Sequence, residues 1–400
     1  MICLPDGRYV VPGNRWDLVT AAHPRPFLSV IVPYYQGERQ LAMLLEGLRL
    51  QSYPRSRFEV IVADDGSPQP LTLDACSLDV RVVRQEDLGF RAAAARNLAV
   101  RSARGQVLVF LDQDTIPTTG YLEAISRLPS LVPDALVVGR REHADLAGWT
   151  PLEVRDWING HGPAPRELGA PEWLSRGYRD SSDLLRADSS SYQYVISAVM
   201  CCSAQLFSEI GGFDESFRHY GGEDWEFAFR AWNAGAVLAH EPAAVAWHDG
   251  PDWAGRSSPD SRRQEKEEEK RALLERIPPE DVSRGEYPAN LLLSLNGPVS
   301  PRLLQALLAC RLNVAVYPDG ETPGRLARSR ARYQATFHGE APSDDLVALL
   351  QDAVDQLREN TVGEVRFGRL LVRSSRVLGR VARWQHALPG RDLMAELFRR

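Results

Sequence analysis

Four short apolar segments in the first 114 residues constrain the fold more than any other feature of this chain. They are FLSVIVPYY at 27–35, FEVIVADDGS at 58–67, VRVVRQ at 80–85 and QVLVFLDQD at 106–114. Short apolar runs bounded by turn signals are typical of buried strands. RQLAMLLEGLRLQSY at 39–53 and RAAAARNLAVRSA at 91–103 have the pattern of helices. This alternation predicts an α/β fold with a mostly parallel sheet and helices on both faces.

Polar residues follow these strands at their carboxyl ends, where open α/β sheets bind ligands. The residues at these positions are Pro33, Asp64, Asp65, Asp112 and Asp114. The sequence therefore predicts a binding site along this edge of the sheet.

The pattern weakens from about residue 139 to 191, where Trp, Pro and Gly interrupt it, and we expect loops and short helices that cover a site. YVISAVMCCSAQLF at 194–207 then predicts a strand. GGFDESFRHYGGEDWEFAFRAWNAG at 211–235 predicts a turn and a helix. AVLAHEPAAVAWHDG at 236–250 predicts a strand that ends at His248.

A chain of 400 residues is too long for one ordinary core, so we expect a large domain with additions. We predict an N-terminal extension at 1–26, a main α/β domain at 27–260 and a charged helical linker at 261–286. Residues 287–400 contain three further strand patterns and the amphipathic helix DDLVALLQDAVDQLREN. They predict a small C-terminal α/β unit.

The formal net charge of −6 gives no overall basic surface for nucleic acid. Five cysteines without a metal-like spacing suit a reducing cytoplasm better than a disulfide scaffold. The N-terminus lacks a signal-peptide pattern, and no run of about 18 apolar residues is present. We therefore expect a cytoplasmic protein, and peripheral attachment to a membrane stays open.

The DQD sequence places Asp112 and Asp114 on either side of Gln113, after a strand. One or two carboxylates with open positions suit a hard divalent cation that binds a diphosphate. Asp is also common in turns for its own reasons, so this pattern alone leaves both interpretations open. Asp64 and Asp65 allow the same two interpretations, an Asx-type turn or hydrogen bonds to a nucleoside. A lone His such as His248 is more often structural, but it offers a nitrogen ligand that carboxylates lack.

In the YGGEDWEF sequence, Glu223 and Asp224 follow two glycines and precede Trp225. Glycines permit positive φ or a close approach of the backbone to a ligand. Acidic residues in a first helical turn also interact favourably with the helix dipole, which explains two carboxylates without any function. Successive helical residues point about 100° apart. Glu223 and Asp224 are therefore expected to face different groups.

Taken together and in this order, these segments resemble the family 2 glycosyltransferases with the GT-A fold. They resemble especially the branch that includes chondroitin-polymerase-type domains and the C-terminal motif of galactosyltransferases. It covers about residues 27–251 and leaves out the last hundred or so. The segments that carry it are LSVIVPYYQGERQLAMLLEGLRLQSY, FEVIVADDGS, VRVVRQEDLGFRAAAARNLAVRSARGQVLVFLDQDTIP, GGFDESFRHYGGEDWEFAFRAWNAGAVL and AVAWHDGP.

The resemblance implies roles for individual residues. Asp224 would be the catalytic base, and Glu223 would contact sugar hydroxyls. Residues implied at the nucleotide sugar are Pro33, Asp64, Asp65, Arg91, Arg96, Asn97, Asp112, Gln113, Gly222 and Trp225. The implied metal ligands are Asp114, His248 and Asp112, with Mn²⁺ or Mg²⁺ as the cofactor.

The activity that the resemblance implies is inverting transfer of a hexose or N-acetylhexosamine from a UDP-sugar to an acceptor hydroxyl. The acceptor, whether a glycan, natural product or peptide, is not indicated by the sequence. Two other classes stay open. A nucleotidyltransferase acting on sugar phosphates would be expected to have an early Gly-rich basic loop, whereas VPYYQGERQ has one Gly and no Lys. A non-catalytic carbohydrate-binding relative would not need the DQD, GGED and His motifs.

Six arginines at alternating steps of three and four mark the C-terminal region: Arg366, Arg369, Arg373, Arg376, Arg380 and Arg383. On a single helix they would form one stripe. EVRFGRLLVRSS also has the pattern of a strand, which would break the stripe. A solvated basic face explains these arginines without a partner. A docking surface for an anionic acceptor, a membrane or another subunit, including a second copy, is the functional alternative.

Overall fold

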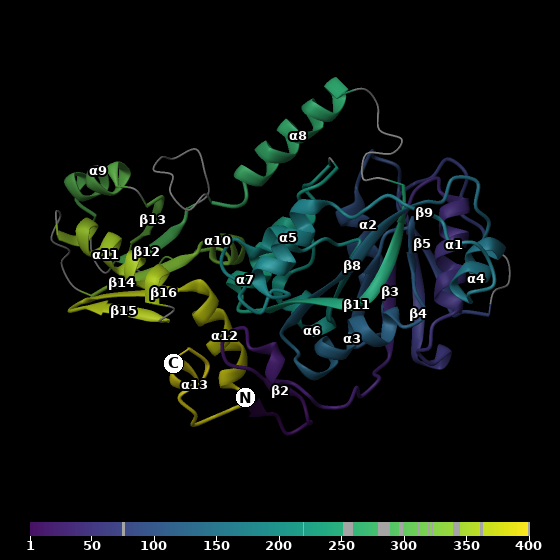
Figure 1. The fold of residues 1–400 in the computed structure, drawn as a ribbon. Helices are drawn as coiled ribbons and strands as arrows, with labels where there is room; N and C mark the ends of the chain where they lie inside the picture. The colour runs from purple at the N-terminus through teal and green to yellow at the C-terminus, as the bar shows by residue number, and fades with distance from the viewer. Residues whose placement is uncertain are drawn as a thin grey trace. The chain divides into compact units, whose positions relative to one another are not determined.

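The computed structural model describes residues 1–73, 77–218, 220–250, 259–278, 289–295, 299–310, 312–318, 321, 323–338, 345–360 and 363–398. The chain divides into two compact units (Figure 1). The first contains residues 1–228 and 237–267, and the second contains 229–236 and 268–400.

The first unit is built on a nine-stranded sheet whose main path runs β5-β4-β3-β6-β10-β8-β11-β7. Its first four strands are parallel and match the predicted ones: β5 Val80–Arg84, β4 Phe58–Asp64, β3 Leu28–Tyr34 and β6 Val107–Leu111. Every residue of β4 and β6 is buried, so both faces of this part of the sheet are covered. The predicted α/β class is confirmed.

The other half of the sheet is mixed. Here β10 Val199–Ser203 is antiparallel to β6 and to β8 Ala135–Asp145, and β8 is parallel to β11 Val237–Asp249. Strand β7 Thr115–Pro117 pairs antiparallel with β11, and β9 Arg166–Glu167 pairs with the end of β8. We expected loops and short helices from about residue 139. This prediction is wrong for residues 139–145, because this polar segment continues strand β8 beside β11.

The helices of the first unit follow the strands closely. They are α1 Glu38–Arg49, α2 Ala92–Arg101, α3 Tyr121–Leu131, α4 Pro151–Ile158, α5 Glu172–Ser181, α6 Ala204–Ile210 and the start of α7 Glu223–Asn233. Helix α2 packs on β3 and β4, while α3 packs on β8, β10 and β11. Ahead of the sheet lie the hairpin β1 Ile2–Cys3 with β2 Tyr9–Val10 and the turn η1 Trp16–Leu18. Two further 3-10 turns are η2 Arg55–Arg57 and η3 Ser191–Tyr194.

The second unit contains its own five-stranded sheet in the order β13-β12-β14-β16-β15 (Figure 1). Its strands are β12 Leu291–Leu295, β13 Val314–Tyr317, β14 Tyr333–Phe337, β15 Glu364–Phe367 and β16 Leu370–Ser374. Its helices are α9 Pro301–Ala309, α10 Arg325–Arg330, α11 Asp345–Asn360, α12 Ser375–Gln385 and α13 Leu393–Phe398. The predicted charged helix is α8 Pro259–Leu274. Leucines of β12, α9 and α11 form one buried core.

The six arginines of the C-terminal region do not form a helical stripe. Arg366 and Arg373 lie on strands β15 and β16, and only the last three lie on α12. Arg380 is fully buried. The Arg376 guanidinium lies 3.6 Å from the centroid of the Trp232 ring and donates to the carbonyl of Ala236 at 2.6 Å. Part of this basic series therefore stabilises the second unit from within, and it is not a continuous solvated face.

None of the helices, over the residues that the structure describes, is both long and apolar enough to span a membrane. The four described cysteines, Cys3, Cys201, Cys202 and Cys310, are free thiols.

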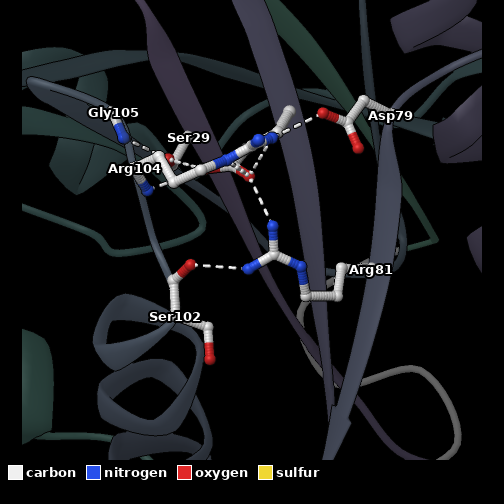
Figure 2. A network of polar contacts seen from close by, with 7 residues as sticks. Ser29, Asp79, Arg81, Ser102, Arg104 and Gly105 are labelled. Atoms are coloured by element: carbon white, nitrogen blue, oxygen red, sulfur yellow. Dashed lines mark hydrogen bonds and ion pairs between the residues drawn. The ribbon is translucent and has the colours of Figure 1, made fainter.

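A buried carboxylate anchors the sheet near the start of β4. Glu59 is 1% exposed and accepts hydrogen bonds from Ser29 Oγ at 2.7 Å and from the Arg104 amide at 2.7 Å. The Arg104 Nε and one Arg81 nitrogen donate to its second oxygen at 2.8 and 3.3 Å. Figure 2 shows how these arginines approach from neighbouring segments, with Arg104 also paired to Asp79. Burial opposes ionisation, but the donors hold the pKa of Glu59 below its usual value of 4.5.

We expect Glu59→Gln to destabilise the chain by about 1.5–3 kcal/mol, because charged hydrogen bonds are lost and an amide NH₂ faces the two guanidinium groups. Since the folded pKa is depressed, the ionised carboxylate stabilises the fold above pH 4.5, and this contribution disappears as pH falls through the folded pKa. Denaturant unfolding at pH 7 and at pH 3.5 measures both effects.

Asp79→Asn provides the control, because Asp79 pairs with the same Arg104 but is 56% exposed. An exposed ion pair contributes only about 0.2–1 kcal/mol. Equal losses for the two variants would contradict the anchoring role of Glu59.

Candidate active site

The carboxyl ends of the parallel strands bring the first predicted residues together. In the strand register Tyr34 lies beside Asp64, and Asp64 lies beside Arg84. The Asp64 carboxylate caps its own turn, accepting from the Ser67 amide at 2.8 Å, and forms an ion pair with Arg84 at 3.7 Å. Its Oδ2 atom, the oxygen that Arg84 approaches, is buried and accepts no hydrogen bond from the part of the chain that the structure describes. The Asx-type turn is therefore present, and one carboxylate oxygen is left for another donor.

Asp65 is held by the segment that precedes α2. Its carboxylate accepts from the Arg91 amide at 2.9 Å and from Gln85 Nε2 at 2.6 Å, and it forms an ion pair with the Arg91 side chain at 3.4 Å. Arg91 and Asp65 thus fix the start of α2 against the end of β4. Pro33 is half-buried one residue before the end of β3, beside Ala63 of β4.

Gln113, between the two aspartates, clamps the loop after β3. Its side chain accepts from the Tyr35 amide at 2.8 Å and donates to the Tyr35 carbonyl at 3.2 Å. A Cβ at Gly37 would lie 2.2 Å from Gln113 Nε2, so a larger residue at this position would displace the Gln113 side chain from Tyr35. The DQD turn and the end of β3 therefore form one rigid edge.

Arg96 joins the two acidic motifs. Its guanidinium donates to Asp112 Oδ1 at 2.8 Å and to Glu223 Oε1 at 2.9 Å, and Arg96 itself is 3% exposed. Burial alone would lower the pKa of Arg96, but the charges of Asp112 and Glu223 raise it above its usual value. A buried guanidinium between two carboxylates requires all three groups for its charge balance.

Asn97, the neighbour of Arg96, holds a turn. Its side-chain amide donates to the Phe213 carbonyl at 2.9 Å and to Glu215 at 3.0 Å, while its oxygen accepts from the Phe213 amide at 3.0 Å. These contacts with the protein occupy both ends of the Asn97 amide. It positions the GGFD turn that precedes α7.

The start of α7 explains the two glycines of the GGED motif. Gly221 and Gly222 both have φ near +90°, a backbone conformation that other residues rarely adopt. Glu223 and Asp224 face different groups, as expected. Glu223 contacts Arg96, and among the described residues its buried Oε2 has no hydrogen-bond partner. Asp224 Oδ2 accepts from the Ser197 amide at 3.4 Å, and its Oδ1 accepts from the Trp225 amide at 2.8 Å.

The surroundings of Asp224 make it a weaker acid than an ordinary aspartic acid side chain. Burial, followed by the negative charge of Glu223, raises the pKa of Asp224 to about 7, and Arg96 opposes this effect. The side chain keeps some exposure to solvent. A carboxylate with a pKa near the working pH is well suited to accept a proton in a reaction.

The β7–β11 pairing brings Asp114 and His248 together from distant parts of the sequence. Thr115 pairs with His248, and His248 Nε2 lies 3.4 Å from Asp114 Oδ2. His248 Nδ1 lies 2.8 Å from the Gly250 carbonyl. Because a carbonyl only accepts, Nδ1 carries a proton. Nε2 donates to Asp114 when the ring is protonated, and in the neutral ring its lone pair faces Asp114.

The hydrogen bond with His248 holds the pKa of Asp114 down against the effect of burial. Burial lowers the pKa of His248, but Asp114 more than compensates and the net shift is upward. Among the residues that the structure describes, no three His, Cys, Asp or Glu side chains are grouped as a metal site. An imidazole nitrogen and a carboxylate oxygen facing each other nevertheless suit a divalent cation that takes its remaining ligands from a diphosphate and water. Asp112, the third metal ligand that the resemblance implied, forms an ion pair with Arg96.

Three further residues contribute to the site, and two of them carry no local sequence signal. His143 on β8 is 2% exposed, lies 5.0 Å from the His248 ring centroid, and donates from Nδ1 to the same Gly250 carbonyl at 3.0 Å. The Ser197 amide holds Asp224. Only Asp249, in the WHDG sequence, had a polar signal of its own, and it accepts from Arg39 of α1 at 2.6 Å.

Two family models match the chain. Residues 29–176 match the model described as glycosyl transferase family 2, and residues 182–244 match the one described as the N-terminal domain of galactosyltransferase. The first match contains Asp64, Arg96 and Asp114, and the second contains the GGED motif.

Several curated proteins are similar to this chain. The chondroitin synthase of Pasteurella multocida is 30% identical over 244 residues, which is 56% of this chain and 25% of that protein. The pre-mycofactocin glycosyltransferase of Mycobacterium tuberculosis is 30% identical over 256 residues, 60% of this chain and 48% of that protein. This chain thus spans a quarter to a half of the length of these relatives.

Among solved structures, the mannosyltransferase PcManGT from Pyrobaculum calidifontis, in complex with GDP-Man and Mn²⁺, is 19% identical. It matches with a TM-score of 0.43, covering 65% of this chain and 68% of that one.

Proposed function

We propose that this chain transfers a hexose or N-acetylhexosamine from a UDP-sugar to an acceptor hydroxyl with inversion, because residues 29–176 match the model described as glycosyl transferase family 2. The proposal assigns the base to Asp224 and the contact with the transferred sugar to Glu223.

One observation carries this proposal: Arg96 links Asp112, at the end of β6, to Glu223, which precedes Asp224 at the start of α7. This buried contact holds a carboxylate with a pKa of about 7 close to the ligand-binding edge of the sheet. The buried Oε2 of Glu223, which accepts no hydrogen bond, suits a donor such as a sugar hydroxyl.

In the proposed reaction the acceptor oxygen forms a bond to the anomeric carbon while the bond from that carbon to the diphosphate oxygen breaks. UDP leaves with the bonding electrons, and Asp224 takes the hydroxyl proton. Attack opposite the leaving group converts an α-linked donor into a β-linked product. A positioned base of this kind contributes about 10²–10⁴ in rate.

Asp114 and His248 are the residues that would hold a divalent cation, Mn²⁺ or Mg²⁺. When bound, such a cation neutralises charge that develops on the leaving diphosphate. Gly250 orients His248 for this role through its carbonyl. Asp64 and Asp65, at the carboxyl end of β4, are the residues proposed for the nucleoside, and β3 lies between β4 and β6 in the sheet.

The proposal is tested by measuring UDP release from a panel of UDP-sugars with and without Mn²⁺, followed by NMR of the product. UDP release with a β-linked product supports it, and an α-linkage in the product contradicts the inverting mechanism. Release of pyrophosphate when a nucleoside triphosphate and a sugar phosphate are the substrates would instead identify a nucleotidyltransferase. Sugar binding without release of either product would identify a non-catalytic protein.

We expect kcat/KM to fall below pH 7, on the order of tenfold per pH unit, because Asp224 accepts a proton only when ionised and its pKa is raised to about 7. A pH profile of UDP release between pH 5 and 9 measures this acid limb. Constant kcat/KM from pH 9 down to pH 5.5 would rule out a base with this pKa.

Glu223→Gln shows where the shift originates. It removes a negative charge that raises the pKa of Asp224, so the acid limb should move to lower pH even though the overall rate falls. An acid limb at the same pH would assign the whole shift to burial.

A further inference from the structure

An exposed aromatic cluster lies beside the candidate base. It consists of Trp173 on α5, Tyr194 in η3 and Trp225 on α7. The Trp173 and Tyr194 rings stack with centroids 6.4 Å apart and an interplanar angle of 27°. Trp225 meets Trp173 edge to face, with centroids 6.1 Å apart. Trp173 is 47% exposed, which is unusual for so large an apolar side chain beside a polar site.

The backbone ties this cluster directly to Asp224. Trp225 follows Asp224 in the sequence, and its amide donates to the Asp224 carboxylate at 2.8 Å. The second backbone donor to Asp224 is Ser197, three residues after Tyr194. A group that rests on the cluster is therefore held close to the atom that would accept its proton.

The cluster is also rigid on its inner side. Tyr178 Oη donates to the Tyr194 carbonyl at 2.7 Å. A Cβ at Gly177 would lie 2.2 Å from the Tyr194 ring, so α5 packs directly against this ring. The Trp173 end of the stack is the most exposed part of the cluster. A preorganised aromatic surface loses little conformational entropy when a ligand binds to it.

The chemistry of the surroundings indicates which ligand fits. Glu172, the residue before Trp173, and Arg176, three residues after it, are both exposed and charged. A lipid chain would require a continuous apolar patch, which these charges interrupt. A pyranose ring combines an apolar C–H face, which rests on an indole, with hydroxyls that hydrogen bond to charged neighbours.

We propose that Trp173 forms an acceptor subsite which stacks on a pyranose ring of a carbohydrate acceptor and presents its hydroxyl to Asp224. This inference rests on the proposed function. It adds the class of acceptor, a glycan or glycoside, and the residue that binds it.

The test compares wild type with Trp173→Ala, Trp173→Phe and Leu152→Ala. Leu152, on α4, is 54% exposed and lies outside the site, so it controls for loss of exposed apolar surface. Acceptors are methyl glycosides of glucose, galactose and N-acetylglucosamine, and the donor is the UDP-sugar that gives the fastest UDP release. Saturation-transfer NMR with the same glycosides measures binding without turnover.

We expect Trp173→Ala to raise the acceptor KM about tenfold, since loss of an aromatic contact has an effect of this size. Trp173→Phe should retain most of the acceptor affinity, and Leu152→Ala should match wild type.

Equal acceptor KM values for Trp173→Ala and Leu152→Ala would overturn the subsite. A second result would also overturn the subsite: wild type binds phosphatidylglycerol vesicles, Trp173→Ala does not, and the two bind glycosides equally. This result would make Trp173 a membrane contact. If wild type releases no UDP from any donor, the proposed function fails. The NMR comparison of wild type and Trp173→Ala still decides whether Trp173 binds a pyranose.

Discussion

Asp224→Asn is expected to lower turnover by about 10² or more while the affinity for UDP-sugar changes little. The substitution keeps the size of the side chain and one of its two hydrogen bonds from the Trp225 and Ser197 amides, but it removes the group that takes the proton. The interaction that is lost is made mainly in the transition state, so kcat falls and donor binding does not. Steady-state kinetics and calorimetry with UDP-sugar measure the two quantities separately.

The simpler explanation of Asp224, a carboxylate that favours a helix dipole, predicts a different result. It allows about 0.3–1 kcal/mol of lost stability and near-normal turnover. Asp345→Asn serves as the control, because Asp345 is an exposed acidic residue in the first turn of α11, in the other unit. A folded Asp224→Asn chain with wild-type turnover would show that Asp224 is not the base.

The second large effect is expected on removal of divalent cations. EDTA should abolish sugar transfer, and added Mn²⁺ or Mg²⁺ should restore it. Loss of an outer partner of a metal ligand weakens metal binding by about 10–100-fold. Asp114→Asn and His248→Ala remove a proposed ligand itself, so they should weaken Mn²⁺-dependent binding of UDP by more than this. Calorimetry with UDP, with and without Mn²⁺, measures this without any turnover.

His161→Ala is the matched control for His248→Ala, because His161 is exposed and forms no part of the site. UDP affinity without metal should be similar in all four chains, because the two side chains act through the cation. Full activity of the wild-type chain in metal-free buffer would remove the metal from the proposal, and with it the ligand role of His248.

The sequence predicted the parts of the fold in which burial leaves a local pattern. Strands β3, β4 and β6 are buried at nearly every residue, so their apolar runs are continuous. The second half of β8 could not be recognised, because GRREHAD is polar and becomes a strand only through pairing with β11. His143 enters the site through this pairing, in register with His248.

The candidate site was predicted as a set of residues but not as a set of contacts. The acidic motifs were visible because their carboxylates stand at strand or helix ends. Spacing gave no sign that Arg96 bridges Asp112 and Glu223, which are 111 positions apart in this numbering. The amides of Asn97 and Gln113 are both engaged with backbone, a role that side-chain chemistry alone does not distinguish from ligand binding.

The Arg96 bridge also limits how this protein can be recombined with its relatives. Arg96 and Asp112 belong to the segment matched by one family model, and Glu223 belongs to the segment matched by the other. Consider a chimera that joins the first segment of one protein to the second segment of another. It takes the buried guanidinium and one of its two carboxylate partners from the first parent, and the other carboxylate from the second parent. Such hybrids will fold around this site only when both parents supply the same charge pattern. Domain shuffling across residues 177–181 is therefore a choice of compatible partners and not a free exchange of modules.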